Sequence, residues 1–192
     1  MKRLTRTLLV SVLIVAVAAI SVAPAGAAKK GTDRPFKASG DGFVTAAPFE
    51  DCEFDVDPIL GGVLVCVQDI EVDPFIGTHI GRSTNTSDGF LTLYLDQGCI
   101  TPSGTFGVEF VSIQFVTIVA ANGDELYVDT EVSGCGDGET PAEPSGTYTI
   151  TEGTGRFLGA TGSGALASDV GPIDPTSGAS TLSTNWYGTI SY

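Results

Sequence analysis

Residues 106–120 are the most informative stretch of the chain, because apolar side chains occupy both alternating sets of positions. One set contains Phe106, Val108, Phe110, Val116 and Ile118, and the other contains Val111, Ile113, Phe115 and Val119. A strand with one face in water alternates apolar and polar residues instead. We therefore expect a strand that is covered on both faces, by the core on one side and by a second subunit on the other.

The rest of the chain alternates between β-rich runs and breaks that contain Gly, Pro, Asn or Asp. No long run of helix formers interrupts this pattern, and turn chemistry marks the connections, as at 87–89, 102–104 and 122–124. Short strands at this spacing predict an all-β sandwich or barrel. The expected strands are 36–46, 51–57, 63–73, 76–86, 89–97, 106–120, 125–133, 146–152, 157–169 and 180–192.

The N-terminus has the three parts of a cleavable secretion signal. A basic region with Lys2, Arg3 and Arg6 precedes an uncharged apolar stretch, which ends in the small-residue cleavage site Ala25-Gly26-Ala27. A transmembrane anchor of similar length is the alternative, but Pro24 and Gly26 favour cleavage. We expect removal of residues 1–27, leaving a secreted, extracellular protein with no membrane insertion. A flexible leader over 28–35 would precede a single domain over 36–192.

Loss of the signal makes the chain strongly acidic. The mature protein keeps six of the nine Lys and Arg residues against 23 acids, a net charge near −17. Such a surface repels phosphate backbones, so we expect no nucleic acid partner, and anionic membranes are disfavoured for the same reason. The remaining residues, about 165, suffice for one domain with its own core.

Four cysteines in an exported chain indicate two disulfides. Cys99 and Cys135 each follow an expected strand, and strand 106–120 runs back between them, which places both at the same end of the sheet. Cys52 and Cys66 flank a tight turn and could face each other across a hairpin. We therefore prefer the pairs Cys52–Cys66 and Cys99–Cys135 over the other two possible pairings.

Five blocks of sequence resemble one known pattern. They are Gly-Thr-His-Ile-Gly-Arg at 77–82, Ala-Asn-Gly-Asp-Glu-Leu at 121–126, Gly-Thr-Tyr-Thr-Ile at 146–150, Gly-Thr-Gly-Arg-Phe-Leu-Gly-Ala-Thr-Gly-Ser-Gly at 153–164 and Gly-Thr-Ile-Ser-Tyr at 188–192. Together they make residues 36–192 resemble the secreted bacterial allene oxide cyclase barrel-like proteins, which are similar to plant allene oxide cyclases and dirigent proteins.

That resemblance implies an antiparallel eight-stranded β-barrel with an interior cavity. It also implies a homo-oligomer, with a trimer favoured, and no cofactor. Two of the ten expected strands are then surplus, and we assign them to an extra hairpin bridged by Cys52–Cys66. None of the matching blocks holds a counterpart of the polar residues that the plant proteins use, so no catalytic residue is assigned.

Three residues on expected central strands are the candidate ligand-pocket residues: Tyr94, Gln114 and Tyr127. If they face inward, they would orient a ligand within an apolar cavity. The other polar motifs have structural interpretations. The lone His79 is expected in a strand as a structural or surface group, and the sequon at Asn85 is expected to be unmodified. Because the chain has one histidine and no Cys-x-x-Cys pair, a Cys/His zinc site is excluded.

The glycine-rich block at 153–164 lacks the Lys-Ser/Thr pair and the helix of a phosphate loop. We expect Gly153, Gly155 and Gly159 to allow positive φ at a barrel corner instead.

Alternating carboxylates are the remaining candidate chemistry. The first group is Asp51, Glu53, Asp55 and Asp57, and the second is Asp69, Glu71 and Asp73. If the two segments pair, calcium is the natural partner of so many oxygen ligands. The alternative is a solvated outer face that discourages aggregation. The chain has no EF-hand pattern, and no metal site is assigned.

These observations predict a secreted barrel that binds a small, largely apolar ligand or serves as an extracellular scaffold, without covalent chemistry. A cofactor-free cyclase or isomerase is the first alternative, and a calcium-dependent surface protein is the second. An apolar cavity with a buried carboxylate or Tyr cluster would favour the enzyme. A filled interior would favour the scaffold.

Overall fold

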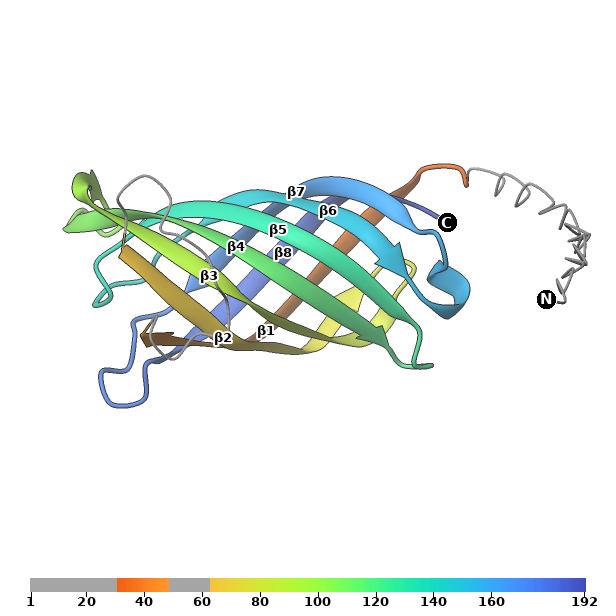
Figure 1. The fold of residues 1–192 in the computed structure, drawn as a ribbon, viewed down its shortest axis with the longest axis horizontal. Helices are drawn as coiled ribbons and strands as arrows, with labels where there is room; N and C mark the ends of the chain where they lie inside the picture. The colour runs from red at the N-terminus through yellow and green to blue at the C-terminus, as the bar shows by residue number, and fades with distance from the viewer. Residues whose placement is uncertain (1–30, 49–62) are drawn as a thin grey trace, which may run out of the picture.

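The part of the chain that the structure describes folds into one sheet of eight antiparallel strands. The computed structural model describes the backbone of residues 31–48 and 63–192, and the side chains of 31–45 and 70–192. Each strand pairs with the next along the chain, and the last pairs with the first, so the sheet closes into a barrel (Figure 1). The strands are β1 (Arg34–Pro48), β2 (Val63–Gly77), β3 (Gly81–Ile100), β4 (Phe106–Ala120), β5 (Glu125–Gly136), β6 (Ser145–Gly153), β7 (Thr161–Val170) and β8 (Ala179–Ser191).

This architecture confirms the expected all-β, antiparallel fold. The helical structure among the described residues is one turn of 3-10 helix, η3 (Gly155–Phe157), which follows β6. Within that same part of the chain, no helix has the length and apolar character needed to cross a membrane. The expected signal peptide and the expected strand 51–57 lie outside the described residues.

The barrel has two distinct ends (Figure 1). At the disulfide end, β3 and β5 finish, and Cys99 and Cys135 form a disulfide with their Cα atoms 6.0 Å apart. At the opposite end, the η3 end, β1 and β3 begin and the C-terminus lies. The expected Cys99–Cys135 bridge is thus confirmed. Strands on either side of a third strand are normally about 9.6 Å apart. Because the Cα atoms of Cys99 and Cys135 are only 6.0 Å apart, the ends of β3 and β5 must bend toward each other across β4. Cys52 and the side chain of Cys66, and with them the expected second bridge, lie outside the described residues.

The expected strand 76–86 is wrong, because the chain turns within it. Thr78, His79 and Ile80 connect β2 to β3, and His79 has a positive φ of 71°. The turn is held against β1, since the Thr78 N–H donates to the carbonyl oxygen of Lys37 at 2.8 Å. His79 therefore lies in a turn and not in a strand.

The expected turn at 87–89 is also wrong, because β3 runs straight through it. A Cβ atom on Gly89 would lie 2.2 Å from the carbonyl oxygen of Ile113 on β4. Glycine at this position therefore permits a close approach of two strands rather than a chain reversal. The expected strands 76–86 and 89–97 thus merge largely into β3, which lowers the number of strands below ten.

Other turn predictions are confirmed. The turns at 102–104 and 122–124 contain Gly104 and Gly123, each with a φ of 85°. Within the glycine-rich block, Gly155 and Gly159 have φ values of 54° and 75°, as expected, and η3 delays the start of β7 to Thr161. Gly153 is not at positive φ; its Cβ would lie 2.7 Å from the Cβ atom of Phe157 instead.

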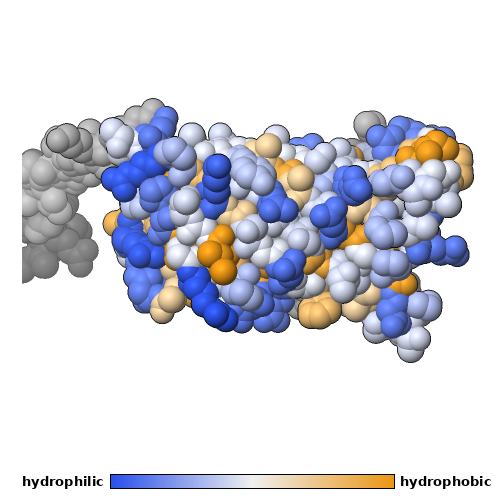
Figure 2. All heavy atoms as spheres, turned by 180° about the vertical axis from the view of Figure 1, so that it is seen from behind, coloured by the Kyte–Doolittle hydropathy of each residue, from blue (hydrophilic) through white to orange (hydrophobic). Residues whose placement is uncertain are grey.

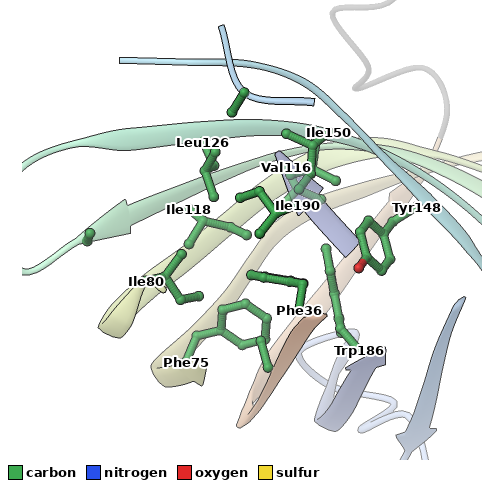
Figure 3. Close-up of a cluster of buried hydrophobic side chains, with 14 of the residues drawn as sticks. Phe36, Phe75, Ile80, Val116, Ile118, Leu126, Tyr148, Ile150, Trp186 and Ile190 are labelled. Carbon is green, nitrogen blue, oxygen red and sulfur yellow. The ribbon is translucent and has the colours of Figure 1, made fainter. Parts of the chain in front are cut away.

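Burial alternates along the strands and defines an inner and an outer face. On β4, Ser112, Val116, Ile118 and Ala120 are buried inward, whereas Val111, Ile113, Phe115 and Val119 alternate with them and face outward. The two apolar faces expected for this strand are therefore confirmed. The buried core of the inner face gathers toward the η3 end, and Figure 3 shows its side chains from different strands pointing toward one another. The second subunit expected on the outer face stays a prediction.

Candidate binding site in the barrel interior

The inner wall formed by β4 to β8 carries no charged side chain, and the structure describes every residue of these five strands. Their acidic residues occupy the alternate, outward positions, as do the exposed Glu109, Asp129 and Glu131. Moving an ion from water into such a lumen is unfavourable unless a partner charge meets it. The interior of the barrel is therefore suited to uncharged molecules.

Near the disulfide end, inward-facing apolar side chains remain partly exposed. We call this set the mouth; it consists of Val44, Leu91, Phe110, Val132 and Leu182. Four of them, all except Phe110, pack against the buried core from its edge. Inward-facing side chains of a completely filled barrel would be buried, so solvent reaches the lumen from this end.

Polar groups lie just below the mouth on two sides of the lumen. On β3 and β4, the Ser87 hydroxyl donates to Gln114 Oε1 at 3.2 Å, and Gln114 Nε2 donates to the Ser112 hydroxyl at 3.0 Å. On β8, Thr184 Oγ1 accepts a hydrogen bond from Trp186 Nε1 at 2.9 Å. These groups form the floor of the mouth, where Ser112, Thr184 and Trp186 are all at least nine-tenths buried.

Below this floor, aromatic side chains fill the lumen. Tyr148 stacks on Trp186 with ring centroids 4.9 Å apart, and Phe36 meets Tyr148 edge-on at 5.9 Å. Phe75 meets Trp186 edge-on at 5.5 Å (Figure 3). Burial raises the pKa of Tyr148 to about 12. The half of the barrel toward the η3 end is therefore a packed core, whereas the inward-facing apolar side chains of the mouth stay partly exposed.

The structure does not bring the three expected pocket residues together. Gln114 faces inward in the floor of the mouth. Tyr94 is paired with the exposed Glu109 and lies on the outer face. Tyr127 also faces outward, where its hydroxyl donates to Glu125, and this hydrogen bond raises the pKa of Tyr127. Only Gln114 therefore belongs to the interior site.

Sequence reasoning missed the residues that dominate the interior, Tyr148, Thr184 and Trp186. The available signal was the alternation in Gly-Thr-Tyr-Thr-Ile at 146–150, which places the aromatic ring and the isoleucine on the same face. The alternation does not tell whether the face that carries Tyr148 is inner or outer. It also does not tell which residues of β7 and β8 contact Tyr148.

A hydrogen-bonded loop network frames the rim of the mouth. The Asp137 carboxylate accepts from the Thr105 hydroxyl and from the backbone N–H groups of Glu139 and Thr140, at 3.0 and 2.7 Å for the two N–H groups. These bonds, led by the one from Thr105, hold the pKa of Asp137 well below its usual range. The network ties the β3–β4 connection to the segment after β5.

The remaining candidates lie away from the lumen or face into the packed core. His79 Nε2 is 3.1 Å from the carbonyl oxygen of Pro35, a contact that fits a structural role. Asn85 is 3% exposed and faces inward, so the folded chain does not present its sequon. The first carboxylate group, 51–57, lies outside the described residues. Among the residues that the structure describes, no cluster of three or more His, Cys, Asp or Glu could hold a metal ion.

The depressions on the described part of the sheet include two of several hundred cubic ångströms. The larger, about 710 Å³, reaches Leu182 of the mouth but is bordered mainly by outward-facing residues that include Asp41, Phe43 and Asp169. The other, about 530 Å³, lies over β2, β3 and β4 beside Phe115. Figure 2 shows one side of the barrel as mostly polar with scattered apolar residues, and more of them near the disulfide end.

No family model, curated protein or solved structure matches this chain. The resemblance to allene oxide cyclase barrel-like proteins therefore rests on the five sequence blocks alone and stays a prediction.

Proposed function

We propose that this protein is an exported barrel that binds a small, uncharged, largely apolar molecule in the mouth. The observation that carries the proposal is the partial exposure of inward-facing apolar side chains above a polar floor. Ligand sites in proteins are typically concave and apolar, with a few polar groups that fix orientation, and eight-stranded barrels are wide enough for one small ligand.

The proposed export rests on the N-terminal sequence and on the cysteines. Residues 1–27 have the pattern of a secretion signal, and the Cys99–Cys135 disulfide is of the kind that persists outside the reducing cytoplasm. A mouth that opens toward the medium could take up its ligand there without any energy source.

The packed half of the lumen supports the scaffold alternative as well, because a core of this kind stabilises a barrel whether or not a ligand is bound. The accessible apolar mouth is what favours binding, since a scaffold gains nothing from leaving Leu91 and Val132 partly in water. No observation specifically favours a cyclase or a calcium-dependent surface protein.

The test is uptake of prodan, an uncharged naphthalene dye, measured by fluorescence titration and by native mass spectrometry. Val132→Trp should block the mouth and abolish uptake. Ala165→Trp, which adds the same side chain at an exposed outward position on β7, is the matched control and should bind like the wild type. A wild-type protein that takes up no dye, or a Val132→Trp variant that binds as well as the control, would contradict the proposal.

A further inference from the structure

Tyr148 has an unusual environment for a buried polar side chain. It is 1% exposed, and its hydroxyl has no hydrogen-bond partner. Among the described residues, the only other buried side-chain oxygen in this condition is Asn85 Oδ1. Leaving a buried donor or acceptor without a partner costs about 1–3 kcal/mol, and such groups in native proteins call for an explanation.

Packing does not explain the hydroxyl. Tyr148 lies in a slot formed by glycines on the two following strands: a Cβ on Gly164 would be 2.7 Å from Tyr148 Cε1, and a Cβ on Gly188 would be 2.5 Å from its Oη. Without side chains, these two glycines let β7 and β8 approach each other closely and leave space for the ring. A phenylalanine would fill the same slot without burying a polar atom. Packing therefore explains the aromatic ring but not the hydroxyl group.

The ring is held in a fixed orientation. Stacking on Trp186 and the edge contact with Phe36 set its plane, and Figure 3 shows its oxygen pointing into the space that these two side chains border. Trp186 is itself fixed by its hydrogen bond to Thr184. An oriented donor in a water-poor site can act on a ligand without first being reorganised.

On β6, a glycine separates the mouth from Tyr148. Gly146, the next inward-facing position toward the disulfide end, has no side chain and is only partly buried. It is paired with Val132 of the mouth on one side and with Leu166 on the other. A molecule held in the mouth therefore has no β6 side chain between it and the Tyr148 ring.

We propose that the Tyr148 hydroxyl is the polar anchor of the site and donates a hydrogen bond to an uncharged acceptor oxygen, such as a carbonyl or ether, at the buried end of the ligand. This inference rests on the proposed function, and it names the class of ligand. The inner wall of β4 to β8 offers no cation to meet a carboxylate or phosphate. With its pKa raised by burial, Tyr148 stays protonated, and therefore a donor, throughout the neutral range.

The experiment compares two dyes on two variants. Prodan carries a carbonyl group, and dimethylaminonaphthalene is the same ring system without it. Wild-type protein should bind prodan more tightly than the carbonyl-free dye, and Tyr148→Phe should weaken prodan binding about threefold to tenfold while leaving the other dye unchanged, as expected for one neutral hydrogen bond. Tyr187→Phe is the matched control, because Tyr187 is 52% exposed on the outer face.

Prodan emission supplies a second measurement, since it shifts to longer wavelength when the carbonyl accepts a hydrogen bond. The shift should disappear in Tyr148→Phe and persist in Tyr187→Phe. If both dyes bind and Tyr148→Phe keeps the full preference for prodan, the anchor assignment is wrong and the proposed function stands. If neither dye binds the wild type, the proposed function fails and this inference fails with it.

Discussion

Replacing Tyr148 by Phe should make the ligand-free protein more stable. The substitution removes a buried hydroxyl without a partner, whose desolvation costs about 1–3 kcal/mol. It leaves a void of roughly 10 Å³, which at about 24 cal/mol per Å³ costs only about 0.2 kcal/mol. The stacking on Trp186 and the contacts with Gly164 and Gly188 are kept, because the ring is unchanged. The free energy of unfolding should therefore rise by about 1–3 kcal/mol.

For a domain of this size, that gain raises Tm by roughly 2–12 °C. The measurement is thermal and urea unfolding of protein refolded from denaturant, so that any carried ligand has been removed. The matched control is Tyr187→Phe, whose hydroxyl is on the exposed outer face and whose loss should leave Tm unchanged. A Tyr148→Phe variant no more stable than the wild type would refute the reasoning, because the hydroxyl must then have a partner in solution, such as a trapped water.

Three further predictions concern the disulfide, the rim and the outer face. Replacing Cys99 and Cys135 together by Ser should lower the free energy of unfolding by about 2–4 kcal/mol, since the bridge spans a sequence separation of 36; urea unfolding measures this loss, and an unchanged midpoint would contradict it. Because the pKa of Asp137 is lowered in the folded state, its carboxylate stabilises the fold above the unfolded value of 3.8, and this contribution is lost as the pH falls. Asp137→Asn should therefore lower Tm at neutral pH, with a difference from wild type that shrinks in acid; a pH-independent difference would show another cause. Ile113→Asp should dissociate the homo-oligomer that the outer face of β4 predicts, for which the family resemblance favours a trimer. Light scattering tests this, and a wild-type chain that is monomeric at high micromolar concentration would defeat the prediction.

Local chemistry was sufficient to predict much of the fold. The strand over 106–120 matched β4 in its bounds, and the turns at 102–104 and 122–124 formed as expected, because glycine at positive φ is a local requirement of the backbone. The Cys99–Cys135 bridge could be inferred as well, since antiparallel strands connected in sequence return to the same end of a sheet.

The errors arose where contact with a strand distant in sequence determines the conformation or role of a residue. The local sequence at 87–89 predicts a turn, yet the role of Gly89 is to let β3 approach the Ile113 carbonyl on β4. The β-forming residues around His79 predict a strand, yet hydrogen bonds with Lys37 on β1 hold its neighbour Thr78 in a turn. Neither partner is visible in the local sequence.

The sequence by itself determined the all-β class, the acidic surface, the apolar character of both faces of 106–120 and the pairing of Cys99 with Cys135. The tertiary structure alone decided which face points into the lumen, and so placed Gln114 inside and Tyr94 and Tyr127 outside. The physical reason is that alternation assigns side chains to two faces without naming them, and only closure of the barrel makes one face the interior. The glycine slot around Tyr148 likewise exists only because the register pairs Tyr148 with Gly164 on β7 and Gly164 with Gly188 on β8.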